Sequence, residues 1–518
     1  MIQSPEWLKK ALFYEIYPQS FYDTNGDGIG DLNGVIAKLD YIKGLGFNAI
    51  WLNPIYDSPF YDAGYDVRDF KKVAPRYGTN EDAYRLFEEA HKRGMHVILD
   101  FVPGHTSIDH PWFKKSCLPE KNEYTDRYVW TNDVGQFPKG YRSINGFYDR
   151  NGSVMTNFFS IQPALNYGFY KKEENYQQTS DEPGPQSTIH DMTDVLRFWM
   201  SHGADGFRCD MADSLVKNDT PDHQGTAKVW HQMIDAIKGE FPEAVFVSEW
   251  NSPYESWNSG FDVDFLLFQE WVKDGNFMLI HGDHPYFSFA KPASLFTKPY
   301  FHNLQAMAKE GEKIGQHYYA PITGNHDVPR VSHDINEEEV KLYMAYLYTS
   351  RGVPFLYYGD EIGMTYWEGL PSKEGAYARA GSRTPMQWDS SAQAGFTTSD
   401  SPYFPVNPNK DAINVASEEL DPHSLLHYVR DLLSFRKEHV ALDNDANITF
   451  IAQLHAKPLV YQREKDGEKL LIAINPSNKE AKVEIPEKDA KVIRYYGEYA
   501  KEKRTLTLKE GSYVILQY

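Results

Sequence analysis

Gly206-Phe-Arg-Cys-Asp210, Val245-Phe-Val-Ser-Glu249 and Thr323-Gly-Asn-His-Asp327 each end an apolar run in a carboxylate. Each pattern predicts a short buried strand whose last residue is an acid. Because an unpaired buried charge is costly, stability alone does not favour such an ending. Since Arg208 and His326 lie beside the acids, we expect a catalytic cluster at one rim of a parallel sheet.

Eight apolar runs of strand-like length follow one another along the chain, and most are separated by stretches with helical spacing. The runs are residues 11–17, 47–53, 96–102, 205–210, 244–249, 262–267, 317–323 and 354–357. Helical spacing is clear over residues 31–45, 80–93, 189–202 and 227–240. Eight β/α alternations predict an α/β fold, a (β/α)₈ TIM barrel with its chemistry at the C-terminal ends of the strands.

Two connections are too long for a plain barrel. Residues 104–185 follow the third strand and are predicted to form an inserted domain B, and residues 359–420 form a loop-rich insertion after the eighth. After a last barrel helix at 421–442, short strands alternate with turns, which predicts a C-terminal antiparallel β-sandwich (domain C) over 444–518. The catalytic barrel (domain A) is then expected to comprise residues 1–103 and 186–443.

The bulk properties exclude several classes of protein. A chain of 518 residues predicts two or three domains. Its net charge of −20 disfavours nucleic acid and anionic membranes as partners. Cys209 lies in a predicted buried strand, so a disulfide with Cys117 is not expected. The N-terminal sequence lacks the features of a signal peptide, and no transmembrane helix is predicted. We expect a cytoplasmic protein that is a monomer or small homo-oligomer.

The residue types around the three acids suggest separate tasks. Arg208 and Asp210 are two apart on a strand and point to the same side, so the guanidinium should keep Asp210 ionised, as a nucleophile requires. A structural salt bridge is an equally good interpretation of this pair. The apolar and aromatic neighbours of Glu249 favour a protonated carboxyl, which suits a general acid. Asp327, behind His326, suits the stabilisation of positive charge on a substrate.

A nucleophile and a general acid, both carboxyls, together define retaining glycoside hydrolysis. The alternative chemistry is a divalent metal site, in which the three acids ligate Mg²⁺. Arg208 argues against this alternative, because a cation beside the first acid competes with a metal ion.

Four segments resemble, in order and spacing, the motifs of the α-amylase family, glycoside hydrolase family 13. They are Asp100-Phe-Val-Pro-Gly-His105, Gly206-Phe-Arg-Cys-Asp210, Glu249-Trp250 and Asn325-His-Asp327. The resemblance covers the chain from about residue 10 to 518. It implies that Asp210 is the nucleophile, Glu249 the acid/base and Asp327 the stabiliser of the transition state. It further implies that the sugar in subsite −1 contacts Arg208, His105, His326 and, by stacking, Tyr65.

Two features concern calcium. Gly104 stands where the family usually has an Asn that in many α-amylases ligates calcium, so that site is expected to be absent. The loop Asp23-Thr-Asn-Gly-Asp-Gly-Ile-Gly-Asp31 alternates oxygen side chains with glycines, which suits Ca²⁺. Gly34 excludes an EF-hand, which would need Glu there. The loop resembles one of the oligo-1,6-glucosidase group, which implies a structural Ca²⁺, replaceable by Mg²⁺. The implied ligands are Asp23, Asn25, Asp27, Ile29 (through its carbonyl) and Asp31; the alternative is a turn-rich loop without metal.

Three features resemble the oligo-1,6-glucosidase and α-glucosidase group. Gln162-Pro-Ala-Leu-Asn166 resembles a group signature, with Ala164 in place of Asp. Ser382-Arg-Thr-Pro-Met-Gln-Trp-Asp389, followed by Ala394-Gly-Phe396, resembles a segment shared with trehalose synthases. Asp62 precedes Tyr65 by three residues, and the resemblance implies that Asp62 pairs with Arg383 to hold the non-reducing-end glucose. This pair predicts exo action; a purely structural ion pair is the alternative.

The predicted activity is retaining, exo-acting hydrolysis of α-1,4 and/or α-1,6 glucosidic bonds in short oligosaccharides. Met211, which follows Asp210, matches neither the Val that accompanies α-1,6 action nor the smaller or polar residues of α-1,4 action. Linkage preference therefore stays open. The alternatives are a trehalose synthase or other α-glucosyl transferase, an endo-acting α-amylase, and a non-catalytic relative such as the heavy chain of an amino-acid transporter. Proteins of the last kind lose catalytic residues and carry a membrane helix.

Overall fold

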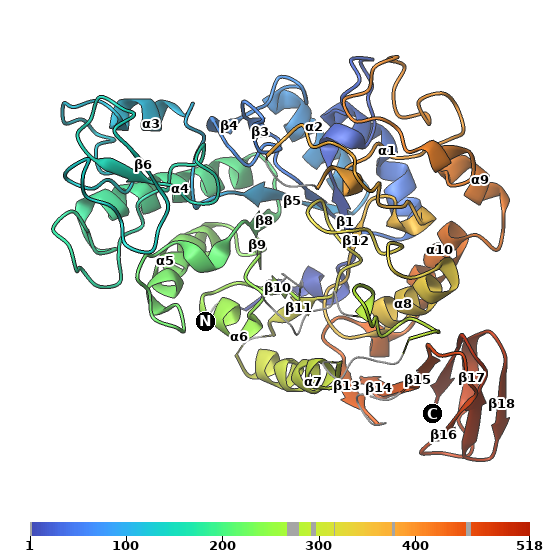
Figure 1. Cartoon of the computed structure of the whole chain (residues 1–518). Helices are drawn as coiled ribbons and strands as arrows, with labels where there is room; N and C mark the ends of the chain where they lie inside the picture. Colours follow the sequence, from blue (N-terminus) through green and yellow to red (C-terminus); the bar gives the residue numbers. More distant parts are fainter. Residues whose placement is uncertain (1–2, 267–278, 292–296, 315, 376–378, 452–456) are drawn as a thin grey trace.

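Eight parallel strands form a barrel at the centre of the molecule (Figure 1). The computed structural model describes residues 3–266, 279–291, 297–314, 316–375, 379–451 and 457–518. The barrel strands are β1 (Phe13–Ile16), β2 (Ala49–Leu52), β5 (His96–Phe101), β8 (Gly206–Cys209), β9 (Val245–Ser248), β10 (Val263–Phe265), β11 (Tyr318–Ala320) and β12 (Phe355–Tyr357). Each of the eight predicted runs contains one of them, which confirms the predicted TIM barrel. β12 pairs with β1, and a parallel bridge between Ile322 and Phe355 joins the β11 and β12 ends.

The helices surround this barrel (Figure 1). They are α1 (Leu32–Leu45), α2 (Asn80–Lys92), α4 (Pro183–Ser201), α5 (Gln224–Glu240), α6 (Pro253–Asn258), α7 (Thr297–Ile314), α8 (Glu337–Thr349) and α10 (Leu425–Glu438). The local sequence determines where several of these helices begin. Thr79 accepts a hydrogen bond from the Asp82 amide while the Asp82 side chain accepts from the Thr79 amide, so this capping box starts α2.

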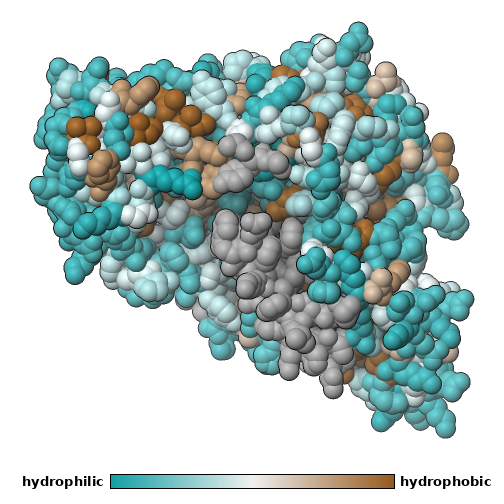
Figure 2. Space-filling view, viewed as in Figure 1, coloured by the Kyte–Doolittle hydropathy of each residue, from teal (hydrophilic) through white to brown (hydrophobic). Residues whose placement is uncertain are grey.

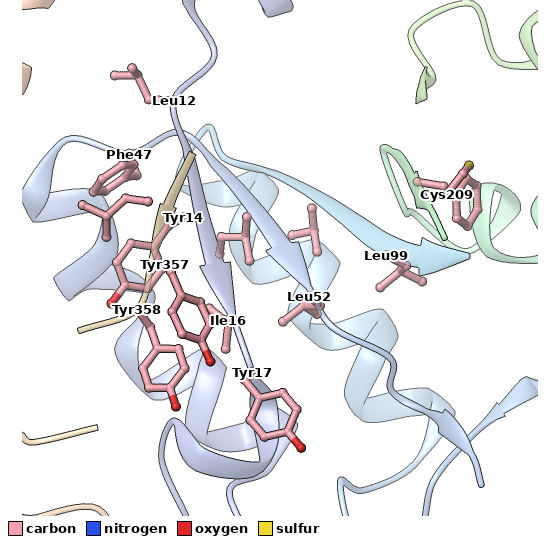
Figure 3. Packing of buried hydrophobic residues seen from close by; sticks show 14 of the residues in the cluster. Leu12, Tyr14, Ile16, Tyr17, Phe47, Leu52, Leu99, Cys209, Tyr357 and Tyr358 are labelled. Atoms are coloured by element: carbon pink, nitrogen blue, oxygen red, sulfur yellow. The ribbon is translucent and has the colours of Figure 1, made fainter. Parts of the chain in front are cut away.

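Alternation along the strands produces two apolar cores. Phe207 and Cys209 of β8 belong to the core between the barrel and its helices, as do Tyr14, Ile16, Leu52 and Leu99 in Figure 3. Their neighbours point into the barrel, where Trp51, Val247 and Phe355 fill the interior. Because side chains alternate along a strand, each barrel strand contributes to both cores. Polar side chains at the C-terminal rim replace this interior packing.

The long connections carry little regular structure. The segment between β5 and α4 contains α3 (Pro111–Ser116), β6 (Ser143–Asn145) and β7 (Ser153–Met155), and a hairpin of β3 (Tyr56–Asp57) and β4 (Asp69–Val73) follows β2. The segment after β12 contains α9 (Val415–Leu420). Among the residues that the structure describes, 3₁₀ helices include η1 (Glu6–Lys10), η2 (Pro18–Ser20), η3 (Ala212–Ser214), η5 (Asp360–Ile362), η6 (Ala380–Ser382), η7 (Pro408–Asp411) and η8 (Val440–Leu442). The exact domain boundaries stay a prediction.

The C-terminal part is an antiparallel β-sandwich, at the lower right of Figure 1. Its strands are β13 (Asn447–Phe450), β14 (Leu459–Lys465), β15 (Glu468–Asn475), β16 (Ala481–Glu484), β17 (Lys491–Tyr496), β18 (Tyr499–Glu502), β19 (Thr505–Leu508) and β20 (Ser512–Gln517). They form a five-stranded sheet, β13-β14-β15-β20-β17, and a three-stranded sheet, β16-β19-β18. Leu471, Leu506 and Val514 lie in the apolar core of this sandwich.

One of the three opening segments is not a strand. β11 ends at Ala320, and residues 323–327 form a turn beyond it. The prediction that Asp327 is the last residue of a strand is therefore wrong, because the chain leaves the barrel after Ile322 and turns across its mouth. The visible surface is mostly hydrophilic (Figure 2). None of the helices described is long and apolar enough to cross a bilayer.

Candidate active site

Arg208 links the acids near the ends of three neighbouring strands. It points into the barrel from β8 and is fully buried. Its Nη1 donates to Asp100 Oδ1 at 2.7 Å and to Asp210 Oδ1 at 2.9 Å, and its Nη2 lies 2.8 Å from Glu249 Oε2. One guanidinium thus holds carboxylates from β5, β8 and β9 within a few ångströms of each other.

The shared arginine does not keep Asp210 ionised by itself. Burial, followed by the charge of Glu249, raises the pKa of Asp210 well above its ordinary value, while Arg208 lowers it. The expectation that Arg208 decides the charge of Asp210 is therefore only half right. Two neighbouring buried carboxyls favour a state in which one of them carries a proton, and the proton belongs to the pair.

Glu249 is positioned by the turn after β9. The Met211 amide donates to Glu249 Oε2 at 3.0 Å. On either side of Glu249, the Ser248 hydroxyl (2.6 Å) and the Trp250 amide (3.1 Å) donate to Asp264 Oδ1. Asp264 therefore ties the turn that carries Glu249 to β10.

Asp327 has a different environment, rich in cations. Its Oδ1 accepts from Arg379 Nη1 at 2.7 Å and from Arg383 Nη2 at 2.8 Å, and its Oδ2 lies 3.1 Å from His326 Nε2. Burial opposes ionisation, yet His326 and the two arginines hold the pKa of Asp327 well below its ordinary value. Asp327 is therefore ionised at neutral pH.

His326 lies between two carboxylates. Its Nδ1 is 2.9 Å from Glu15 Oε1 on the side opposite Asp327. Although burial lowers it, the pKa of His326 is raised to about 9 by Asp327 and then Glu15. The ring is therefore an imidazolium at neutral pH and donates from both nitrogens.

Tyr65 joins the two groups of acids. Its hydroxyl donates to Asp100 Oδ2 at 3.1 Å and lies 2.6 Å from His326 Nε2. Its ring stacks on His326, with centroids 5.3 Å apart and planes 11° apart. A continuous polar network therefore runs from Glu249 through Arg208, Asp100 and Tyr65 to His326 and Asp327.

The partner of Asp62 is Arg379, and the predicted pairing with Arg383 is wrong. Arg379 Nη2 donates to Asp62 Oδ1 at 2.7 Å, while its Nη1 binds Asp327. Arg383 instead donates to Asp327 and to the His326 carbonyl. Gln162 donates to Asp62 Oδ2 at 2.7 Å. The two arginines are four residues apart, and the path of the chain places only the first beside Asp62.

His105 lies at the edge of the network. Its Nε2 is 3.1 Å from the Tyr65 carbonyl and its Nδ1 is 3.0 Å from Asn157 Nδ2. Burial lowers the pKa of His105 to about 4. All nine predicted catalytic and substrate residues thus lie in one connected region.

The predicted metal loop is held by its own hydrogen bonds. Its side chains accept hydrogen bonds from the loop's own backbone: Asp23 from Gly26 and Gly28, Asn25 from Asp27, and Asp27 from Ile29. Asp31 caps α1 by accepting from Gly34. In the part of the chain that the structure describes, no three His, Cys, Asp or Glu side chains are grouped to hold a metal. Only a mixed set with the Asn25 amide and the Ile29 carbonyl remains, and these hard oxygens suit Ca²⁺.

Sequence reasoning missed several residues of the site. Asp100 lies inside the third apolar run, near its end, so an acid within an apolar segment could have indicated it. Glu15 and Asp264 are acids inside apolar runs, which is also a readable signal. Arg379 and Asn157 carry no local pattern, because their importance arises from contacts across the fold.

The C-terminal rim of this (β/α)₈ barrel carries two neighbouring carboxyls and a third acid that is held by cations. This combination is typical of one class of protein, the barrel enzymes that cleave glycosidic bonds. The model of the α-amylase catalytic domain matches residues 15–445. The chain therefore belongs to the α-amylase family, as the motifs predicted, and is a glycoside hydrolase.

Known relatives narrow the group. An oligo-1,6-glucosidase of Heyndrickxia coagulans is 32% identical, with 94% of this chain and 95% of that protein covered. A trehalose synthase/amylase of Mycolicibacterium smegmatis is also 32% identical, covering 84% of this chain and 77% of that protein. Among solved structures, a mutant of the trehalulose synthase MutB in complex with Tris is 29% identical and has a TM-score of 0.82. The match covers 99% of this chain and 100% of the MutB chain.

Proposed function

We propose that the protein is a retaining α-glucosidase that removes glucose from the non-reducing end of short α-glucans. The observation that carries this proposal is the Asp62–Arg379–Asp327 cluster. Arg379 lies 2.7 Å from each carboxylate and joins the loop after β2 to the segment after β12. Charged groups that close one side of a site limit it to the end of a sugar chain, and similarity to the oligo-1,6-glucosidase supports the same substrate class.

In the proposed reaction, Asp210 attacks the anomeric carbon while Glu249 gives its proton to the glycosidic oxygen, and the leaving sugar departs. Glu249 then takes a proton from water, whose oxygen attacks the same carbon and releases Asp210. Two inversions at one carbon retain its configuration. The reaction starts with one carboxylate and one acid in the Asp210–Glu249 pair, and the raised pKa of Asp210 supports a single proton shared between them.

Asp327 and His326 are assigned to the sugar itself. An ionised carboxylate beside the ring stabilises the positive charge that develops at the anomeric carbon. The His326 imidazolium and Arg379 hold this carboxylate in place. Because one face of the Tyr65 ring stacks on His326, we propose that Tyr65 stacks on the sugar with its opposite face.

A product panel tests the exo assignment. The wild-type protein should release glucose from maltotriose, isomaltose and panose, and the ratio of these rates gives the linkage preference. Arg379→Ala should lower kcat/KM on these substrates by at least about tenfold, because two carboxylates lose their shared cation. Rapid internal cleavage of starch, without activity on disaccharides, would show an endo-acting enzyme instead.

The nucleophile assignment predicts the effect of a single isosteric change. Asp210→Asn keeps the size of the side chain but removes the attacking oxygen's charge, so kcat should fall by at least about 1,000-fold. Steady-state glucose release from maltose measures the loss. The matched control is Asp235→Asn, which makes the same change at an exposed carboxyl of α5 without removing the nucleophile. Near-normal turnover by Asp210→Asn would refute the assignment.

A second candidate is an α-glucosyl isomerase. The specific observation that favours it is similarity to a trehalose synthase/amylase and, in the fold, to a trehalulose synthase. Maltose and sucrose separate the two candidates. Trehalose or an isomer of sucrose as the main product identifies an isomerase, whereas free glucose identifies the hydrolase.

We also propose that residues 23–31 bind Ca²⁺ through the oxygens of Asp23, Asn25, Asp27, Ile29 and Asp31, with Mg²⁺ as a weaker substitute. The alternation of oxygen side chains with glycines supports this. Removing metal with EDTA should lower Tm, and added CaCl₂ should restore it by roughly 2–4 °C. Asp27→Ala should abolish the response; an identical Tm with and without calcium would refute the site.

Two further assignments rest on sequence. We propose a cytoplasmic protein that acts as a monomer or small homo-oligomer and binds neither nucleic acid nor membranes. The net charge of −20 supports the expectation that the protein binds neither nucleic acid nor anionic membranes. Light scattering coupled to size exclusion gives the mass in solution, and fractionation of cells gives the location.

A further inference from the structure

Gly104, the residue before His105, lies against the side chain of Asn157. A Cβ atom on residue 104 would stand 2.6 Å from Asn157 Nδ2, closer than real Cβ contacts allow. Gly104 is not among the residues with positive φ, so its backbone conformation suits any amino acid. The Asn157 amide fills the volume that a side chain at 104 would occupy, so any larger residue there has to displace this amide.

The orientation of this amide follows from His105. His105 Nε2 lies 3.1 Å from the Tyr65 carbonyl, which can only accept, so Nε2 carries the hydrogen. Because burial lowers its pKa to about 4, the ring is neutral above that pH and its Nδ1 is an acceptor. Asn157 therefore presents its NH₂ group to Nδ1 at 3.0 Å, and Nδ2 also lies 3.9 Å from Met211 Sδ.

Asn157 Oδ1 then points away from both partners. Among the residues described, none donates to it. Asn157 is half-buried and lines a cavity of about 440 Å³ between the inserted segment and the segment after β8. Other residues around this cavity include Tyr141, Arg142, Asp213, Lys217 and His223. The carbonyl is thus a polar acceptor open to a ligand.

This cavity lies on the leaving-group side of the site. Glu249 delivers its proton to the glycosidic oxygen, so the leaving sugar must lie next to Glu249. Asp213 of the cavity is near enough that Glu249 adds to burial in raising its pKa. Met211 contacts Glu249 through its amide and Asn157 through its sulfur. Asn157 is therefore adjacent to the position that the departing sugar must occupy.

We propose that Asn157 is a specificity-determining residue whose Oδ1 accepts a hydrogen bond from a hydroxyl of the leaving sugar. Its Nδ2 meanwhile keeps His105 in one tautomer and contacts Met211. This inference rests on the proposed glucosidase function and adds a recognition element on the inserted segment. It predicts that the enzyme distinguishes sugar leaving groups from leaving groups without hydroxyls.

Two substrates test this. Asn157→Ala should lower kcat/KM for maltose by about five- to tenfold, the value of one hydrogen bond. For p-nitrophenyl α-glucoside, whose leaving group has no sugar hydroxyl, kcat/KM should stay within about twofold of wild type. Equal losses on both substrates would show that Asn157 acts only through His105, and no loss on either would show no contact; both results overturn the proposal. Asn145→Ala, an exposed asparagine of the same segment, is the control.

Gly104→Ala provides an independent variant. Its new Cβ must displace the Asn157 amide, so it should cause the same selective loss on maltose. In the double variant Gly104→Ala/Asn157→Ala the methyl group has room, and kcat/KM should equal that of Asn157→Ala alone. Losses that multiply would overturn the proposed steric pair, because independent sites add in free energy.

A measurement of maltose binding distinguishes a failure of this inference from a failure of the proposed function. Calorimetry with maltose should show weaker binding to Asp210→Asn/Asn157→Ala than to Asp210→Asn by about five- to tenfold. If the wild-type protein releases no glucose, the proposed function fails, while this difference in binding still supports the role of Asn157. Equal binding by the two variants overturns that role whatever the activity.

Discussion

At the scale of single residues, the number of cations around each acid decides its charge. Three carboxylates, Asp100, Asp210 and Glu249, share Arg208, so one guanidinium balances three charges. Asp327 lies beside three cations, Arg379, Arg383 and His326. Arg379 is shared with Asp62, and His326 is shared with Glu15. Burial and the charge of Glu249 raise the pKa of Asp210, whereas its neighbouring cations hold the pKa of Asp327 well below its ordinary value. This difference matches the acid/base chemistry proposed for the pair and the electrostatic task proposed for Asp327.

His326 makes this balance dependent on pH. Its pKa is about 9 in the folded protein, against about 6.5 for a free histidine. A raised pKa means that protonated His326 stabilises the fold fully below pH 6.5, and that this contribution is lost as pH rises through 9. The Tm difference between wild type and His326→Gln should therefore narrow from pH 6.5 to 9.5. A constant difference across that range, measured by calorimetry, would contradict the assigned charge.

At the scale of elements, the spacing between β8 and β9 brings Asp210 and Glu249 together. Gly206 begins β8 opposite Val245 of β9. A Cβ on Gly206 would lie 2.1 Å from the Val245 carbonyl oxygen. The two strands can pair in this register only because the residue has no side chain.

Gly206→Ala should therefore destabilise the protein by about 2–3 kcal/mol through overpacking, and should lower kcat because the two acids separate. Gly44→Ala is the matched control. Gly44 lies in α1, where an added Cβ would have no neighbour within 4 Å, so alanine should stabilise by about 0.5–1 kcal/mol. Thermal unfolding of both variants measures the contrast. A Gly206→Ala variant as stable as wild type would show that β9 can shift freely.

The sequence was most informative at this scale. Hydrophobic period and length located all eight barrel strands, because burial on both faces leaves a local trace. The prediction of a strand over residues 323–327 was wrong, because the small and polar residues beyond β11 form a turn. Nothing in the period of that segment distinguishes a strand end from a turn across the barrel mouth.

At the scale of the whole molecule, the C-terminal sandwich is tied to the barrel by a buried arginine. Arg463 of β14 donates to the carbonyls of Thr349 (2.7 Å), Asp443 (2.7 Å), Ala446 (3.2 Å) and Asn447 (3.2 Å). Thr349 is the last residue of α8, so this one side chain joins a barrel helix to the sandwich and to the linker between them.

Arg463→Ala should lower stability by about 3 kcal/mol or more, because several buried carbonyls lose their donor. Arg463→Lys should recover only part of this, since an ammonium cannot reach all four acceptors. Tm measured by calorimetry should fall in that order, while kcat at 25 °C stays unchanged. A loss of kcat without a fall in Tm would show that the sandwich affects the site directly.

The sequence by itself determined the barrel, the identity of the three acids and the family, because strand periodicity and motif spacing are local properties of the chain. Only the tertiary structure decided the contacts between distant segments. Asp62 and Arg379 are 317 residues apart, and Arg383 is an equally good partner by sequence position. Likewise, Gly104 has meaning only beside Asn157. Such pairings depend on the paths of the loops over the barrel mouth and on competition among buried charges, and neither leaves a trace in local sequence.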